Sequence, residues 1–246
     1  MSFDGKPHIL AASGGLVPVE GGGPFHWRFG PLMHHAIELA GRPERPRFCY
    51  VGTAGGDSLE RLVAMSRALT GTGVRLSRLE LFPQPNVPDI RAHLLDQHVV
   101  WVGGGSVANL LAVWRAHGLG AVFREVWEAG VVLAGTSAGS LCWHVGGTTD
   151  AFGPQLRGFT DGLGLLPYAN CVHYDTEQQR RPLFRRLVAD GTLPPGYATD
   201  DGVGLHYAGT QLVEAVSDRP GAAAYLVTPD GSGATTEQQI AARLLG

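Results

Sequence analysis

Two kinds of hydrophobic pattern alternate along the chain. Short apolar runs rich in Val, Ile and Leu are followed by longer segments in which apolar residues recur every third or fourth position. The short runs predict buried strands, and the longer segments predict amphipathic helices. Strands are expected at residues 8–12, 48–53, 74–82, 98–102 and 131–134. Helices are expected at residues 32–40, 59–69, 90–95, 107–117 and 119–129.

This order of elements predicts an α/β fold. A strand, a helix and a further strand form a right-handed crossover, so the first two thirds of the chain is expected to be a doubly wound, mostly parallel sheet with helices on both faces. After residue 168 the apolar runs shorten, which predicts some antiparallel pairing near the C-terminus. These strands are expected at 169–174, 197–198, 203–207, 212–216 and 222–228, with a helix at 177–188. The length of 246 residues predicts one domain spanning 1–246.

Composition narrows the function. The formal net charge of −3 and the lack of a long basic run give no reason to expect nucleic acid or an anionic membrane as a partner. The three cysteines show no C-x-x-C spacing, so buried free thiols are expected. No apolar run suits a signal peptide or a membrane span, which favours a cytoplasmic enzyme. The histidines and acids show no metal-ligand spacing such as H-x-x-x-H, and no metal or other cofactor is predicted.

Glycine-rich turns follow several predicted strands, and Ser137 lies in one of them. Ligands of parallel α/β sheets bind beyond the carboxyl ends of the strands, where these turns gather. Ser137 is flanked by glycines, with an apolar strand before it and a predicted helix at 138–144 after it. This arrangement is typical of a nucleophile elbow, a tight turn that exposes the serine hydroxyl. The sequence therefore predicts that Ser137 is the nucleophile of a hydrolase.

A serine nucleophile needs a base and a carboxylate that orients the base. His173 ends an apolar run, where a strand would deliver it to the same edge of the sheet, and His206 is its rival. Asp201 follows a short strand and is the first candidate for the acid. The rival acids are Asp150 and Asp175.

The turn at residues 103–105 is the predicted partner of Ser137 in stabilising an oxyanion. Backbone N–H groups of such a turn and of the residue after the nucleophile commonly form the oxyanion hole, which here selects Ala138. The alternative interpretation of the same three glycines is a phosphate-binding turn at the N-terminus of the following helix. The Lys-Ser/Thr pair of a P-loop is absent, and the next strand lacks the acid that binds a ribose, so nucleotide binding is disfavoured.

Taken together, these motifs resemble the peptidase E family, the aspartyl dipeptidases and their relatives. They are V-G-G-G-S-V-A-N-L-L at 102–111, G-T-S-A-G at 135–139, G-L-G-L-L at 162–166 and His-Tyr at 173–174, in the family's order. The resemblance implies the flavodoxin-like core shared with class I glutamine amidotransferases. It also implies a triad of Ser137, His173 and Asp201, where the aspartyl dipeptidase has glutamate in place of Asp201. The oxyanion donors would be the N–H groups of Gly105 and Ala138.

The resemblance further implies small peptides as substrates, Asp-X dipeptides among them. Aspartyl dipeptidases bind the acidic side chain with an arginine in the helix after the catalytic histidine, and an ungapped match puts Gln179 at that place. Arg180 or Arg181 is the nearest replacement, so Arg180 and Gly104 are the candidate substrate contacts. A homodimer is one assembly that the sequence leaves open.

Two other functions stay open. The missing arginine is compatible with a binding or regulatory protein that keeps the elbow but does not turn over peptides. An esterase-like hydrolase would use Ser137, Asp175 and His206, with the acid preceding the base along the chain.

Overall fold

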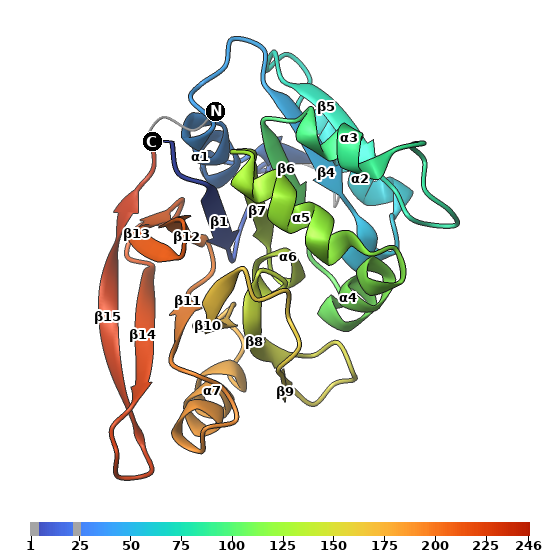
Figure 1. Cartoon of the computed structure of the whole chain (residues 1–246). Helices are drawn as coiled ribbons and strands as arrows, with labels where there is room; N and C mark the ends of the chain where they lie inside the picture. Colours follow the sequence, from blue (N-terminus) through green and yellow to red (C-terminus); the bar gives the residue numbers. More distant parts are fainter. Residues whose placement is uncertain (1–4, 22–25) are drawn as a thin grey trace.

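Five parallel strands form the N-terminal half of the sheet. The computed structural model describes residues 5–21 and 26–246. The strands stand in the order β5-β4-β6-β7-β1 (Figure 1). Because β5 and β6 lie on opposite sides of β4, the order reverses there, and ligands of such sheets bind next to this point. The bounds are β1 (His8–Ala12), β4 (Arg47–Val51), β5 (Arg75–Leu79), β6 (Val99–Val102) and β7 (Val132–Thr136).

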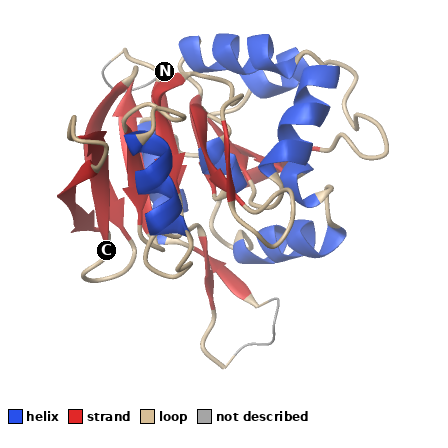
Figure 2. Cartoon of the chain, turned by 90° about the horizontal axis from the view of Figure 1, so that it is seen from below, coloured by secondary structure: helices blue, strands red, loops and turns tan. Residues whose placement is uncertain are grey.

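Alternation of side chains along each strand builds two cores. Leu133 packs in the core beneath α3, α4 and α5, while its neighbour Ala134 packs in the core beneath α1 and α2. Each fully buried leucine of this kind stabilises the fold by about 1.5–3 kcal/mol. Figure 2 shows the helices packed around the strands. The helices are α1 (Pro31–Leu39), α2 (Leu59–Ala68), α3 (Ile90–Leu95), α4 (Val107–Ala116) and α5 (Leu119–Glu128).

Polar side chains fix where three of these helices begin. Ser58, Asp89 and Ser106 precede α2, α3 and α4, and each side chain accepts a hydrogen bond from the backbone N–H three residues ahead. Such a cap satisfies an otherwise unpaired donor and stabilises a helix by about 1 kcal/mol. The cap at Ser106 makes α4 start directly after the glycine turn 103–105.

Strands in mixed parallel and antiparallel pairing extend the sheet into the C-terminal half. β12 pairs with β1, and the sheet continues in the order β13-β15-β14-β11-β10-β8-β9. β15 joins the two halves, since residues 235–241 pair with β14 and residues 242–244 pair with β13. In Figure 1, β14 and β15 form the long hairpin at the lower left, next to α7 (Arg180–Ala189). The bounds are β8 (His144–Thr149), β9 (Arg157–Phe159), β10 (Leu166–Cys171), β11 (Gly196–Thr199), β12 (Val203–Ala208), β13 (Gln211–Ser217), β14 (Ala223–Pro229) and β15 (Thr235–Leu244).

The predicted fold class is confirmed, but some elements differ. The helix expected at 138–144 is only α6 (Ala138–Leu141), and His144 opens β8 instead. A Cβ at Gly147 would lie 2.1 Å from the carbonyl oxygen of Asn170, so glycine lets β8 approach β10 closely. β15 was not predicted because its sequence begins T-T-E-Q-Q and lacks an apolar run. Four short elements are also new: β2 (Leu16–Pro18), β3 (Trp27–Phe29), β9 (Arg157–Phe159) and the 3-10 helix η1 (Thr53–Gly55).

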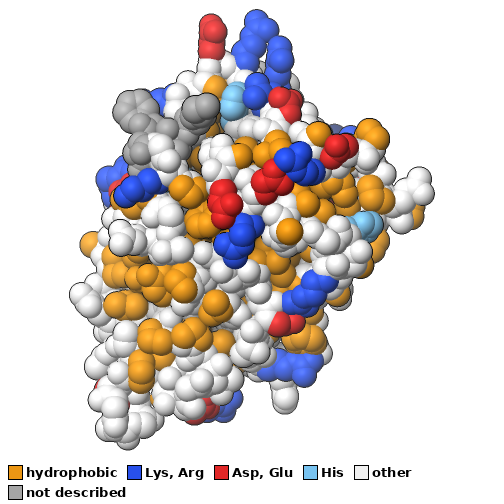
Figure 3. All heavy atoms as spheres, viewed as in Figure 1, with side chains coloured by type: hydrophobic (Ala, Val, Ile, Leu, Met, Phe, Trp, Pro, Cys, Tyr) orange, Lys and Arg blue, Asp and Glu red, His pale blue; other side chains and the backbone are white. Residues whose placement is uncertain are grey.

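The state of the cysteines and the charges on the visible surface match what the composition predicts. Cys49, Cys142 and Cys171 are all buried free thiols, as predicted. Within residues 5–21 and 26–246, no helix is both long and apolar enough to cross a membrane. Figure 3 shows basic and acidic side chains next to one another on the face in view, rather than gathered by sign.

Candidate active site

Ser137 lies at a strained turn between β7 and α6. Its φ of 56° and ψ of −114° are unusual for a residue with a side chain, and such a conformation costs on the order of 1–3 kcal/mol. The turn is tight because the flanking glycines leave no room for a Cβ: one at Gly135 would lie 2.4 Å from the carbonyl oxygen of Gly139. The Ser137 N–H donates to the carbonyl of Ala12 on β1, at 3.0 Å. This is the strand–turn–helix geometry of a nucleophile elbow.

His173 lies directly against this serine. It follows β10, and the distance from its Nε2 to the Ser137 Oγ is 3.0 Å. Its backbone also has a positive φ, of 56°, and its N–H donates to the Ser13 hydroxyl at 3.4 Å. Ser13 in turn bonds the Thr199 hydroxyl at 2.6 Å. These contacts connect the ends of β1, β10 and β11 and fix the imidazole beside Ser137.

Asp201 is hydrogen bonded to the other ring nitrogen of His173. Its Oδ1 is hydrogen bonded to His173 Nδ1, and its Oδ2 accepts a bond from the Thr176 hydroxyl at 2.8 Å. The bond from His173, with a smaller contribution from Thr176, holds the pKa of the Asp201 carboxyl below its usual value. Asp201 is therefore ionised at neutral pH, which suits a group that orients and stabilises a histidine base.

The structure places the rival residues elsewhere. Asp175 accepts the backbone N–H of Asp201 at 2.8 Å and pairs with Arg219, so it supports the loop that carries Asp201. Asp150 is exposed and lies 4.0 Å from the Arg180 guanidinium. The His206 imidazole bonds His8 Nδ1 at 2.9 Å. Neither rival acid contacts His173 among the described residues.

The glycine turn after β6 lies next to Ser137. A Cβ at Gly104 would lie 3.2 Å from the Ser137 Cβ and 3.8 Å from its Oγ. Gly105 has a φ of +141°, and a Cβ there would lie 2.2 Å from the carbonyl oxygen of Ala54. Ala138, the first residue of α6, is buried. The N–H groups of Gly104 and Gly105 donate to no carbonyl of the described residues, which leaves both available to another acceptor.

Comparison with known proteins gives the family. The sequence profile of Peptidase family S51 matches residues 21–215. The chain belongs to peptidase family S51. The uncharacterized peptidase YgaJ of Bacillus subtilis (strain 168) is 41% identical over 184 residues, which are 75% of this chain and 79% of YgaJ. Membership confirms the predicted resemblance and makes the chain a serine-type peptidase of the peptidase E type.

Two solved structures share the fold of this S51 peptidase. A peptidase E candidate from Listeria monocytogenes EGD-e superposes with a TM-score of 0.61 at 14% identity, over 86% of this chain and 98% of its own. A peptidase from an acI-B1 Actinobacterium superposes with a TM-score of 0.65 at 17% identity, over 96% of this chain and 95% of its own. At these identities the likeness concerns the fold alone.

A cavity of about 560 Å³ opens beside the His173–Asp201 pair of the S51 peptidase. Arg61 of α2 reaches its edge and donates to the Gly104 carbonyl at 2.7 Å. Among the described residues that line the cavity, Arg61 is the one Lys or Arg. No sequence signal points to this role, because a charged residue in an amphipathic helix normally faces solvent. The apolar walls are Leu16, Trp27, Tyr50, Ala64, Met65 and Trp101.

Arg180, the predicted substrate contact, is buried in the S51 peptidase and engaged internally. Only 2% of its surface is exposed. Its guanidinium donates to Glu177 at 2.7 Å and to the Thr148 carbonyl at 2.6 Å. It is not among the residues that line the cavity beside His173. Its contacts favour a role in holding α7 against β8.

Proposed function

We propose that this S51 peptidase cleaves small peptides with a triad of Ser137, His173 and Asp201. One observation carries the proposal: His173 Nε2 lies 3.0 Å from the Ser137 Oγ while its Nδ1 is bonded to Asp201. A histidine held in this way by a carboxylate has its basic nitrogen directed at the hydroxyl, which is the requirement for activating a serine.

The reaction follows from these contacts. The Ser137 Oγ attacks the carbonyl carbon of the scissile amide, and its proton passes to His173 Nε2. The tetrahedral intermediate collapses as His173 gives this proton to the leaving nitrogen, so that the C–N bond breaks and an acyl-serine remains. Water then attacks the acyl group, again losing a proton to His173. That proton returns to Ser137 as the acid product leaves.

The backbone N–H groups of Gly105 and Ala138 are the proposed oxyanion donors. Two features support this assignment. Ala138 directly follows the nucleophile at the start of α6, and the turn 103–105 approaches Ser137 closely at Gly104. Fixed donors of this kind stabilise the charge that develops on the carbonyl oxygen, and losing one typically costs about 10²- to 10³-fold in kcat.

The proposed substrate is a small peptide that carries a carboxylate. The cavity volume of about 560 Å³ suits a ligand of a few residues. Its aromatic and aliphatic walls suit an apolar side chain, and Arg61 at its edge suits a carboxylate, because guanidinium and carboxylate groups pair in a fixed geometry. That carboxylate is either the peptide's C-terminus or the side chain of an acidic residue, as in an Asp-X dipeptide.

Active-site labelling and a peptide panel test this function. A fluorophosphonate probe should modify Ser137, identified by mass spectrometry of the digested protein, and Ser137→Ala should lose both labelling and hydrolysis. The matched control is Ser66→Ala, which changes an exposed serine on α2 and should leave both intact. Labelling that survives in Ser137→Ala would remove this serine from the mechanism.

The panel separates the two sources of the carboxylate. It compares Ala-Phe, Asp-Phe and the C-terminally amidated form of each. If amidation abolishes cleavage of both peptides, the C-terminal carboxylate is the group that pairs with Arg61. If amidated Asp-Phe is still cleaved and amidated Ala-Phe is not, the acidic side chain is that group. Equal cleavage of all four would refute the carboxylate requirement while leaving the triad untouched.

A further inference from the structure

Three potential metal ligands meet at a place that the proposed peptidase function does not use. His35 lies on α1, His206 on β12 and Glu214 on β13. One ligand atom from each residue lies within 4.8 Å of the other two, and in the described part of the chain no other set of three does so. None of the three lines the cavity beside His173. His206 and Glu214 face each other across the paired strands β12 and β13, while His35 lies far from both in the sequence, so no spacing motif predicts the set.

The His35 ring is oriented as a metal-binding imidazole usually is. Its Nδ1 lies 3.3 Å from the Glu38 carboxylate, one turn along the same helix. A proton on Nδ1 is held by this contact, and the lone pair of Nε2 is then directed at Glu214. Metal-ligating histidines commonly bond a carboxylate in this way with their second nitrogen.

The contact between His35 Nε2 and Glu214 is too long to be a hydrogen bond. The nitrogen is buried, has no hydrogen-bond partner in the described chain, and lies 3.8 Å from Glu214 Oε1. His35 as a whole is only 5% exposed. A buried polar atom without a partner destabilises the folded protein. A cation between this nitrogen and the carboxylate would satisfy both atoms.

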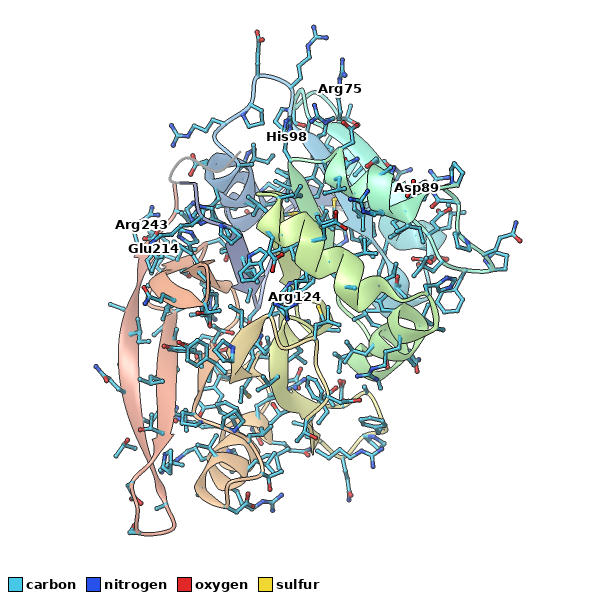
Figure 4. All side chains as sticks on the ribbon, viewed as in Figure 1. Arg75, Asp89, His98, Arg124, Glu214 and Arg243 are labelled. Carbon is cyan, nitrogen blue, oxygen red and sulfur yellow. The ribbon has the colours of Figure 1, made fainter. Side chains whose placement is uncertain are left out.

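The other two ligands are also held in place by neighbours. The His206 imidazole bonds His8 Nδ1 at 2.9 Å through its Nε2, which orients the ring. Glu214 receives two hydrogen bonds from the Arg243 guanidinium, at 2.9 and 2.8 Å, and the two side chains lie together at the end of β15 in Figure 4. Arg243 holds the pKa of Glu214 below its usual value, which keeps the carboxylate ionised.

We propose that His35, His206 and Glu214 bind a divalent transition-metal ion of the zinc type. Two imidazoles and one carboxylate are a ligand set that Zn²⁺ prefers, with water completing four-coordination. Tetrahedral ligands at about 2.0–2.2 Å from zinc are about 3.4 Å apart, so the three side chains move slightly inward. Arg243 then stays on the Oε2 of Glu214 while Oε1 binds the metal. The ion ties α1 to the antiparallel strands β12 and β13.

A proton is the competing occupant of this place. A doubly protonated His35 would pair with Glu38 and Glu214 on opposite sides and would need no metal. The two occupants differ in a measurable way. If the site holds a proton instead of a metal, the protein has no saturable affinity for zinc at this position.

Calorimetry on the full chain distinguishes them. Protein freed of metal with EDTA and then dialysed is titrated with ZnCl₂, and Co²⁺ is added in parallel to report tetrahedral coordination by visible absorption. Wild type should bind one equivalent, with a rise in melting temperature. His35→Asn and Glu214→Gln should each weaken binding by at least about tenfold, since even losing a supporting residue of a metal site costs that much.

His34→Asn is the matched control, because His34 is the exposed neighbour of His35 on α1. It should bind zinc as wild type does. Glu214 is part-exposed on its strand, so Glu214→Gln decides the question if His35→Asn does not fold. No saturable binding by wild type at one equivalent, or equal affinity in wild type and Glu214→Gln, would overturn the proposal.

Discussion

Replacing Asp201 by asparagine tests the triad most directly. The carboxylate accepts from His173 Nδ1 on one oxygen and from the Thr176 hydroxyl on the other. Asparagine keeps the shape but has one acceptor and one donor. If its NH₂ group faces His173, the imidazole must carry its proton on Nε2, and that nitrogen can no longer take the proton of Ser137. If its oxygen faces His173, the NH₂ group meets Thr176 and the imidazolium loses its charged partner.

Both orientations remove catalysis without removing the fold. In a Ser-His-Asp triad the same exchange lowers kcat by about 10⁴-fold, which corresponds to about 5.4 kcal/mol of transition-state stabilisation. We expect a loss of this order for Asp201→Asn, measured as kcat on the best peptide of the panel. Thr176→Ala is the control, because it removes the hydrogen bond from the Thr176 hydroxyl and keeps the negative charge of Asp201. The kcat of this variant should fall by less than about tenfold.

The result that would refute the reasoning is simple. An Asp201→Asn variant that keeps kcat within tenfold of wild type would show that the bond between Asp201 and His173 does not serve catalysis. A stability measurement accompanies the assay. Because the pKa of Asp201 is lowered in the folded state, its ionised form adds stability above the unfolded pKa of about 3.9, and this is lost as pH falls further. The free energy of unfolding should therefore fall less steeply with decreasing pH, below about pH 4, in the variant than in wild type.

The remaining predictions concern the glycine turn, the cavity and the core. Gly104→Ala should lower kcat at least about tenfold, since the added methyl lies 3.2 Å from the Ser137 Cβ and displaces the nucleophile. The control is Gly120→Ala in α5, where the added methyl makes only ordinary contacts, and its kcat should be unchanged. Arg61→Gln should raise KM for carboxylate-bearing peptides about 10- to 100-fold and leave kcat nearly constant, whereas a fall in kcat alone would contradict a binding role. Burial lowers the pKa of His144 to about 4, so the folded state resists its protonation, and urea unfolding should show about 3 kcal/mol lost between pH 7 and pH 4. That loss should be absent in His144→Gln, and an unchanged pH dependence there would assign it to another group.

The candidate site could be predicted in part because some of its features are local. The strand, the positive-φ turn and the short helix around Ser137 depend on consecutive residues, and glycines at 135 and 139 are needed wherever such a turn is packed tightly. The helix expected at 138–144 was too long for the opposite reason. Its end is decided by how closely β8 approaches β10, a contact made by residues more than twenty positions away.

The choice among the rival acids and bases needed the fold. The sequence favours Asp201 as the acid but leaves Asp175 and Asp150 open as rivals. In the structure, Asp201 accepts from His173 and Asp175 accepts from the backbone of Asp201. Arg180, the expected substrate contact, is buried against Thr148, while Arg61, for which the sequence suggested no role, reaches the cavity. Nothing in the chain near either arginine indicates which one lies at the cavity.

The sequence by itself determined the order of the strands and helices that build the parallel half of the sheet, the turn that carries Ser137 and the family resemblance, because hydrophobic period and glycine placement act through neighbouring residues. Only the tertiary structure decided that His173 and Asp201 meet at this serine, that Arg61 edges the cavity, and that His35, His206 and Glu214 come together. Those contacts join residues far apart in the chain. Their geometry is set by how the strands pair and the helices pack, so no single segment encodes it.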